Sequence, residues 1–304
     1  MRYMRKRKHK HKKHKIKVQS TFYKKTLFQA IFLCSIILFL WVSFRNNENQ
    51  TIESVVNVVE ETPKQLEEQK PDPQKIEKKE LGYVEIIESC GSYFNIDSCV
   101  NIRSGPGTSY EAVAKMRNGV VLRTSGSVEA EGRVWYKIIF DEWLRYPERV
   151  ETDWYVAGDF VRYFVDEGPI EIVSGDKIVT KKKIVVDLSE QTLYAYDGGG
   201  LFMKEFVSTG LELTKTPRGS FTLFKKMPTR YMQGPLPGIS EQYYDLPGVP
   251  WTMYFTGQGA AIHGAYWHEK FGEEWSHGCV NLPPTQAREL YEWADVGTPV
   301  IVQD

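Results

Sequence analysis

An uncharged run of 18 residues near the N-terminus, Leu27 to Phe44, constrains this chain more than any other feature. At about 1.5 Å per residue, a helix over this run reaches roughly 27 Å, close to the hydrocarbon thickness of a bilayer. Residues 1–26 hold twelve Lys or Arg and no acidic residue, and such a basic flank stays on the cytoplasmic side of a membrane. The sequence therefore predicts a basic cytoplasmic head (1–26), a transmembrane helix (27–44) and export of everything that follows.

A cleaved signal peptide and a nucleic-acid-binding arm are the alternatives for this N-terminus. No small-x-small cleavage site follows the apolar run, where the chain continues Val-Ser-Phe-Arg, and Leu33 before Cys34 does not suit a lipoprotein signal. A basic arm can bind nucleic acid, but here an apolar run follows it directly. We therefore expect a single-pass cell-membrane protein with no nucleic-acid partner.

The segment after the membrane run changes composition twice. Residues 45–80 consist mostly of Glu, Gln, Lys, Asn and Pro, with too little apolar surface to offset the entropy of ordering, which predicts a disordered stalk. From residue 81 to 165, short β-type runs alternate with Gly and Pro turns. Strands at this spacing favour a small antiparallel barrel.

This region resembles the bacterial SH3-like domain, in the run Asn101–Tyr110 and in Trp135-Tyr136-Lys137-Ile138 and Trp154-Tyr155-Val156. The resemblance implies attachment to cell-wall peptide, although the aromatic residues equally suit a barrel core. Residues Asp141–Asp153 are an insertion relative to the compact form of that family.

Cys90 and Cys99 lie in this exported region. A local disulfide between them and a pair of buried thiols are both compatible with the sequence, because spacing does not determine connectivity.

A second β-rich unit spans residues 181–304. Its 22-residue segment Met227–Gly248, rich in Gly, Pro and Tyr, has no clear periodicity, and a lid is one role for such a segment. The only soluble-type helix is predicted after Cys279, where Pro283-Pro284 precede apolar residues at i, i+3, i+4 and i+7, namely Ala287, Leu290, Tyr291 and Ala294. The predicted fold is thus mainly β.

The stretch Ala261–Leu282 contains Cys279 and every histidine outside the basic head. A cysteine near its reference pKa is mostly protonated at neutral pH, so a thiol nucleophile needs an imidazole to take its proton. No histidine follows Cys279, which excludes the papain-like order and leaves His263 or His277 as the base. His263, followed by Gly264, can come from a neighbouring strand and is the better candidate. Gly278 lets backbone amides turn toward an oxyanion.

The pattern His263-Gly264, a loop, and Ser276-His277-Gly278-Cys279-Val280-Asn281 resembles the L,D-transpeptidase (YkuD-type) catalytic motif. Further matching runs are Val186–Leu193, Ser208-Thr209-Gly210, Thr216–Phe221 and Trp251–Phe255. The resemblance covers about 181–304 and implies a β-sandwich with one helix after the catalytic cysteine.

By that resemblance, Cys279 attacks the third residue of a peptidoglycan stem tetrapeptide and expels D-Ala, and an acceptor amine then resolves the thioester. His263 would be the general base, oriented by the backbone carbonyl of Gly264. The family also implies that carbapenems acylate Cys279. The remaining residues carried over are His277, Gly278, Ser276 and Asn281 for the oxyanion site and cleft, and Met253 and Tyr254 for substrate binding.

Several alternatives stay open at this level. Water in place of the amine would give an L,D-carboxypeptidase, and a wall-linked protein as acceptor would give an anchoring enzyme. Cys279 could be an inert buried thiol, or a zinc ligand together with the three histidines, or the chain could be a non-catalytic wall-binding protein acting through the SH3-like domain. We expect no cofactor and no metal, a location facing the cell wall, and His268 on a loop surface.

Overall fold

A computed structural model describes residues 80–92, 95–172, 180–238 and 241–304. The chain divides into two compact units, Met1–Gln74 and Lys75–Asp304, and all the described residues belong to the second. The predicted basic head, the transmembrane helix at 27–44 and the stalk up to residue 79 lie outside the described residues. Within the described ranges, none of the helices has the length and apolar character needed to cross a bilayer.

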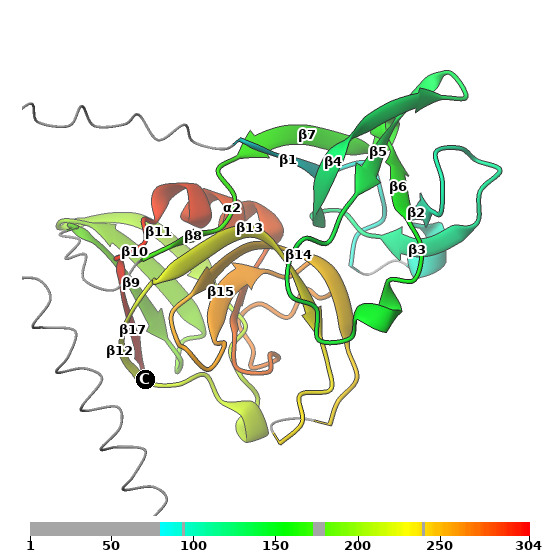
Figure 1. The fold of residues 1–304 in the computed structure, drawn as a ribbon. Coiled ribbons are helices and arrows are strands. Elements are labelled where there is room, and N and C mark those ends of the chain that lie inside the picture. Colours follow the sequence, from blue (N-terminus) through cyan, green and yellow to red (C-terminus); the bar gives the residue numbers. More distant parts are fainter. Residues whose placement is uncertain (1–79, 93–94, 173–179, 239–240) are drawn as a thin grey trace, which may run out of the picture. The chain divides into compact units, whose positions relative to one another are not determined.

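The first β domain is an antiparallel sheet of seven strands in the order β3-β2-β6-β5-β4-β1-β7 (Figure 1). Its buried side chains include Val84, Ile102, Leu122 and Val156. The strands are β1 (Leu81–Ile86), β2 (Val100–Arg103), β3 (Ala112–Met116), β4 (Val121–Ala130), β5 (Arg133–Ile138), β6 (Trp154–Ala157) and β7 (Val161–Asp166). Three 3-10 turns accompany them, η1 (Ile96–Ser98), η2 (Pro147–Arg149) and η3 (Gly158–Phe160). The assignment of this domain to the SH3-like family stays a prediction.

Cys90 and Cys99 form a disulfide between β1 and β2, with their Cα atoms 4.8 Å apart. Both are buried, and the backbone of Cys90 also accepts a hydrogen bond from the amide of Asn118 at 3.0 Å. The disulfide therefore closes a loop that backbone contacts already hold against the β3–β4 turn.

The C-terminal domain is built from two five-stranded sheets, β11-β10-β9-β17-β12 and β16-β15-β14-β13-β8. The first consists of β9 (Lys182–Asp187), β10 (Thr192–Asp197), β11 (Gly200–Phe206), β12 (Gly219–Thr222) and β17 (Pro299–Gln303). The second consists of β8 (Ile170–Glu171), β13 (Lys225–Gln233), β14 (Asp245–Tyr254), β15 (Ala261–Gly264) and β16 (Val280–Leu282). A 3-10 turn, η4 (Glu212–Thr214), lies between β11 and β12. The mainly β prediction is thus confirmed.

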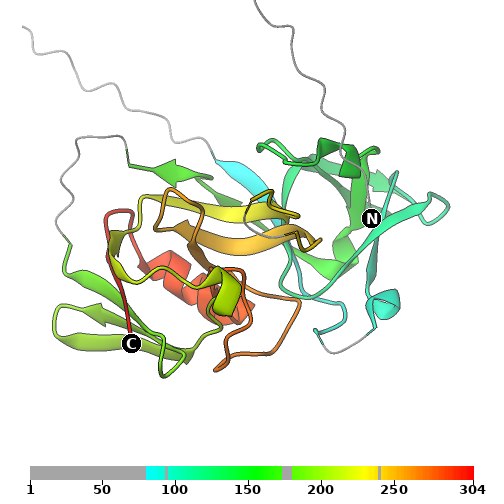
Figure 2. The ribbon, with the colours of Figure 1, turned by 90° about the horizontal axis from the view of Figure 1, so that it is seen from below.

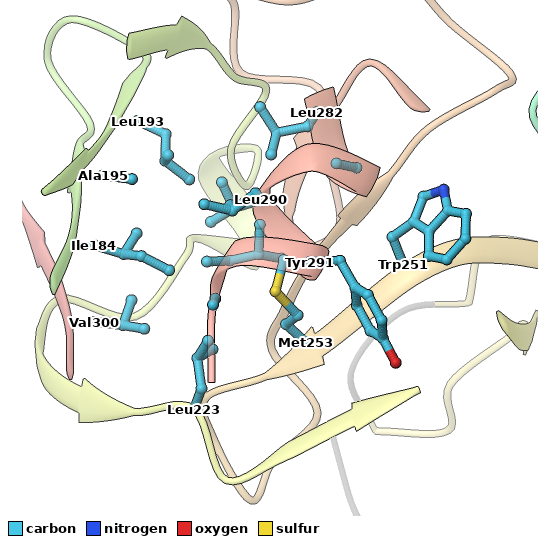
Figure 3. Packing of buried hydrophobic residues seen from close by; sticks show 14 of the residues in the cluster. Ile184, Leu193, Ala195, Leu223, Trp251, Met253, Leu282, Leu290, Tyr291 and Val300 are labelled. Atoms are coloured by element: carbon cyan, nitrogen blue, oxygen red, sulfur yellow. The ribbon is translucent and has the colours of Figure 1, made fainter. Parts of the chain in front are cut away.

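One α-helix of the described residues, α2 (Pro284–Trp293), lies between these two sheets (Figure 2). Pro284 opens it, and Ala287, Leu290, Tyr291 and Ala294 are at most 4% exposed, as their helical spacing predicts. Figure 3 shows Leu290 pointing toward Leu193 and Ile184 of one sheet while Tyr291 lies beside Trp251 of the other. The helix after Cys279 therefore joins the two sheets into one core.

A buried lysine closes the C-terminal end of α2. The ammonium group of Lys226, on β13, donates to the backbone carbonyl of Tyr291 at 2.6 Å and to that of Ala294. The side chain is 7% exposed, and burial lowers the pKa of its ammonium. The last carbonyls of a helix lack intrahelical partners, so this cation satisfies them and complements the helix dipole.

The segment Met227–Gly248, which has no periodicity in the sequence, is mostly an antiparallel hairpin of β13 and β14. Val249 to Met253 is a continuous buried run on β14, and Lys226 to Pro228 is another on β13. Strands covered on both faces do not alternate between polar and apolar residues. Half of this aperiodic segment, residues 227–233 and 245–248, therefore lies in strands.

The two β domains contact each other through this hairpin. The hydroxyl of Thr229 on β13 donates to the backbone carbonyl of Val121 on β4 at 2.5 Å, and Tyr83 of β1 and Val121 belong to the same buried cluster as Trp251. The short strand β8 pairs with Lys225 and Lys226 at the edge of the second sheet. The segment that links the two predicted domains thus supplies a strand to the C-terminal one.

Candidate active site

The site forms where strands β15 and β16 run parallel, with Ile262 opposite Val280 and His263 opposite Asn281. Cys279 comes directly before β16, so this register brings the thiol to the start of β15. Its Sγ lies 3.9 Å from the carbonyl oxygen of Gly259. A parallel pair joined by a short crossover thus brings together a histidine and a cysteine that are 16 residues apart in the chain.

His263 is buried at 2% exposure, and its Nδ1 lies 3.0 Å from the carbonyl oxygen of Gly264. A carbonyl only accepts, so Nδ1 carries the proton and Nε2 keeps a free lone pair. Burial lowers the pKa of this imidazole to about 4, while the Gly264 carbonyl acts in the opposite direction. His263 is therefore neutral at pH 7, in the tautomer that a general base requires.

Cys279 is a free cysteine that keeps some exposed surface. Enclosure of the sulfur nevertheless raises the pKa of the thiol to about 11, and the backbone amide of Ala261 partly offsets this rise. With the imidazole also neutral, the resting site holds a thiol and an imidazole rather than a thiolate–imidazolium pair. Such a site transfers the proton during attack on a carbonyl, as general base catalysis requires.

The turn before Cys279 is fixed by Ser276. The hydroxyl of Ser276 donates to the carbonyl of Cys279 at 2.5 Å and accepts from the amide of Gly278 at 3.1 Å. Gly278 has a φ of +111°, a conformation that favours glycine. Its amide, which the sequence proposed for the oxyanion, is thus bound to Ser276 in this structure.

The run Ser208-Thr209-Gly210 holds the same turn from outside. Ser208 forms an isolated β-bridge with Asn281, and Gly210 forms one with Ser276. The carbonyl of Thr209 accepts a hydrogen bond from the amide of Ser276 at 2.9 Å. Sequence comparison links this run to the catalytic motif without giving it a role. Its role here is to fix the backbone on both sides of Cys279.

His277 contacts the loop between β13 and β14. Its Nε2 lies 2.7 Å from the Oε1 of Gln242, and its ring centroid lies 5.6 Å from that of Tyr244. Burial raises the pKa of Tyr244 to about 12, and the charge of Cys279 contributes to that rise. Tyr244 and Gln242 therefore border the site, and no local pattern in the sequence marked either of them.

His268 is 7% exposed, so the expectation of a surface loop residue was wrong. Its Nδ1 accepts the amide hydrogen of Lys270 at 3.0 Å, and its Nε2 lies 3.0 Å from the side-chain amide of Asn281. Since Nδ1 accepts, Nε2 carries the proton and must face the oxygen of that amide. Turning the Asn281 amide by 180° achieves this and removes its unpaired buried oxygen.

Of the two residues predicted to bind substrate, the structure places only Tyr254 beside open space. It lines a cavity of about 500 Å³ whose wall also includes Trp143, Gly257 and Gly259. Met253 is fully buried in the core instead (Figure 3), so its prediction as a cleft residue was wrong. Adjacent residues of a strand point to opposite sides of the sheet. The register of the strand alone decides which of the two side chains lies toward the cavity.

The three histidines and Cys279 do not converge on one point. His277 binds Gln242, whereas His268 binds Asn281. Among the described residues, no group of three or more His, Cys, Asp or Glu side chains could hold a metal ion.

Residues 181–302 match the family model YkuD, described as an L,D-transpeptidase catalytic domain. This part of the chain is a YkuD domain. A Mycobacterium tuberculosis protein assigned as L,D-transpeptidase 3 is 35% identical over 94 residues, which are 29% of this chain and 34% of that protein. A Bacillus licheniformis protein assigned as L,D-transpeptidase YkuD is 27% identical over 123 residues, 40% of this chain and 64% of that protein. The chain thus spans less than two thirds of either relative.

Solved L,D-transpeptidases also resemble the chain. One from Mycobacterium smegmatis aligns at 24% identity and a TM-score of 0.39, over 56% of this chain and 90% of that one. The catalytic domain of the Enterococcus faecium enzyme aligns at 27% identity and a TM-score of 0.36, over 41% and 99%. The YkuD domain is established by the family match and by the residues around Cys279.

Proposed function

We propose that this protein is a peptidoglycan L,D-transpeptidase. The observation that carries the proposal is the pairing of β15 with β16, which sets Cys279 beside a strand whose His263 is held by the Gly264 carbonyl with Nε2 unprotonated. The family match at residues 181–302 supports the same chemistry.

In the proposed reaction, the Sγ of Cys279 attacks the carbonyl carbon of the third residue of a stem tetrapeptide while its proton moves to Nε2 of His263. The oxyanion is stabilised by the backbone amides of His277 and Cys279, because the amide of Gly278 is bound to Ser276. Collapse of this intermediate breaks the amide bond, and the leaving D-Ala amine takes the proton from His263. A thioester on Cys279 remains.

An acceptor amine then attacks the thioester and gives its proton to His263, which returns it to the departing thiolate. The product is a cross-linked dimer when the amine belongs to a second stem. Water in place of the amine gives a shortened stem, which is carboxypeptidase activity, and an amine on a wall-linked protein would anchor that protein.

The membrane anchor, the stalk and the SH3-like assignment rest on the sequence alone. An uncleaved helix at 27–44 would anchor the chain in the cell membrane, and the stalk at 45–80 would let the YkuD domain reach the wall. The first β domain would be an SH3-like domain that binds wall peptide.

The test uses full-length protein and a stem tetrapeptide that ends in D-Ala, with D-Ala and cross-linked dimers quantified by mass spectrometry. Both products are expected, and Cys279→Ala should abolish both. D-Ala without dimers would favour the carboxypeptidase. Turnover that persists in Cys279→Ala would refute the mechanism. Because a solved Enterococcus faecium domain is described as acylated by ertapenem, a carbapenem adduct on Cys279 in the intact mass is the matching active-site titration.

A further inference from the structure

The loop between β13 and β14 forms one side of the site and contacts His277. We call residues 234–238 and 241–244 the hairpin loop. The Oε1 of Gln242 accepts a hydrogen bond from Nε2 of His277 at 2.7 Å, and the ring of Tyr244 lies 5.6 Å from that imidazole. The position of these two side chains therefore depends on what holds the hairpin loop.

The hairpin loop is held by an arginine of the first β domain. One guanidinium nitrogen of Arg149, Nη1, donates to the carbonyl of Tyr244 at 3.1 Å and to Oδ1 of Asp245 at 3.2 Å. The other, Nη2, donates to the carbonyl of Gly234 at 2.8 Å. Arg149 thus connects Gly234, where the hairpin loop begins, to Tyr244 and Asp245, where the chain enters β14.

Two aromatic rings pack against the guanidinium of Arg149. The ring of Tyr146 lies 4.1 Å from the guanidinium carbon and that of Tyr243 lies 4.4 Å from it. The Arg149 side chain is 16% exposed. Charged hydrogen bonds are stronger when they are shielded from water, and only the planar fork of arginine can stack and donate in two directions together.

Two further residues of the segment Asp141–Asp153, Tyr146 and Glu142, also contact the hairpin. The backbone of Tyr146 exchanges hydrogen bonds with the side-chain amide of Gln233, at 2.9 and 3.1 Å, and its hydroxyl donates to the carbonyl of Pro235 at 2.9 Å. Glu142 accepts from the amide of Tyr231 at 2.8 Å and pairs with Arg230. Residues Asp141–Asp153 therefore follow the hairpin from its middle to its loop.

Glycine at position 234 allows the close packing that this contact requires. A Cβ there would lie 2.3 Å from the ring of Tyr244 and 2.8 Å from the carbonyl of Gln242. The amide of Gly234 also donates to the carbonyl of Tyr244 at 2.8 Å. The Tyr244 carbonyl thus accepts from both Gly234 and Arg149, so Arg149 binds directly to the residue whose ring contacts His277.

We propose that Arg149 is a positioning residue of the YkuD site, which holds Tyr244 and Gln242 against His277 from the neighbouring domain. Only the kinetic effect expected from this inference rests on the proposed function. It assigns the insertion of the first β domain to the enzyme's own site, in addition to any wall contact that this domain makes.

The test compares Arg149→Gln and Arg149→Lys with Arg133→Gln, a control arginine of the same domain whose partner Asp159 is exposed. Displacing one wall of a site can cost up to ~100-fold in rate, so we expect kcat/KM for the stem tetrapeptide to fall ~10- to 100-fold in both Arg149 variants. Rates are normalised to the fraction of Cys279 that a carbapenem titrates. Lysine should not rescue, because it keeps the charge and lacks the fork. Turnover equal to that of Arg133→Gln would overturn the proposal.

Two further measurements, hydrogen exchange and the titration of His277, do not depend on catalytic turnover. Hydrogen exchange of peptides over residues 241–248 should speed up in Arg149→Gln and not in Arg133→Gln. The pKa of His277, which burial lowers, should rise in Arg149→Gln when followed by NMR with labelled histidine. If the unmodified protein has no activity, the proposed function fails while these readouts still decide the role of Arg149. Unchanged exchange and an unchanged His277 titration would refute it.

Discussion

His263 and Asn281 lie opposite each other across the parallel β15–β16 pair, so the register of one short strand sets how far the imidazole of His263 lies from the thiol of Cys279. Three structural contacts keep this register: the backbone pairs of Ser208 with Asn281 and Gly210 with Ser276, and the contact of Asn281 with His268. His263 and Cys279 are thus positioned mainly by backbone pairing, which small changes in side chains outside the turn should leave intact.

The protonation states of the resting pair predict the pH dependence of thiol reactivity. The pKa of Cys279 is raised to about 11 and that of His263 is lowered to about 4. Alkylation of Cys279 by iodoacetamide should therefore rise about tenfold per pH unit from pH 7 to 10, as the thiolate fraction does. The rate is measured by intact mass, with Cys279→Ser as the unreactive control. A plateau between pH 5 and 8 would instead indicate a preformed ion pair.

Two buried histidines predict a loss of stability in mild acid. The pKa of both His263 and His268 is lowered from 6.5 to about 4 by burial. The unfolded chain therefore binds more protons than the folded one between pH 6.5 and 4, so stability is complete above pH 6.5 and falls as the pH falls through this window. Each histidine contributes up to about 1.4 kcal/mol per pH unit.

The variant His268→Gln isolates one of these contributions, because glutamine can bind Asn281 and does not titrate. Urea unfolding from pH 7 to 4.5 should show a shallower decline of the unfolding free energy in the variant than in the parent protein. Parallel declines would show that His268 is not protonated in this window.

The disulfide of Cys90 and Cys99 predicts a redox-dependent stability. It closes a loop with a sequence separation of 9, and a loop of this size stabilises by about 2 to 3 kcal/mol. Replacing both cysteines by serine should lower the unfolding free energy by this amount, as measured in urea. Dithiothreitol should destabilise the parent protein equally and leave the double variant unchanged, whereas insensitivity of the parent would contradict the pairing.

The buried face of helix α2 is where we expect substitutions to reduce stability most. Leu290 is fully buried between the two sheets (Figure 3), and truncating a buried leucine to alanine typically costs about 2 to 5 kcal/mol. Leu290→Ala should therefore lower the thermal midpoint strongly. The neighbouring Glu289 is exposed on the same helix, so Glu289→Ala is the matched control and should change stability by less than about 0.5 kcal/mol.

Local patterns predicted the parts of this protein that depend on neighbours in the sequence. The burial of Ala287, Leu290 and Tyr291 follows from helical spacing, and the expectation that His263 comes from a strand neighbouring the Cys279 segment is confirmed. Features that depend on distant pairing were missed. Met253 and Tyr254 differ only in the face of β14 they occupy, and that face is set by the register with β15.

The same limit applies to the histidines and to the hairpin. His268 is buried because Asn281, 13 residues away, binds its ring. The contact of Arg149 with Asp245 joins residues 96 apart, and neither lies in a recognisable pattern. Burial on both faces also removed the alternation that would have predicted β13.

The strand β8 has a consequence for where the catalytic domain begins. The family match starts at residue 181, yet Ile170 and Glu171 pair with Lys226 and Lys225 and cover the edge of β13. A protein cut at residue 181 would expose that edge to pairing with other chains, as open sheet edges do. The folding unit therefore begins about one strand before the family match does. A soluble fragment should begin before Ile170.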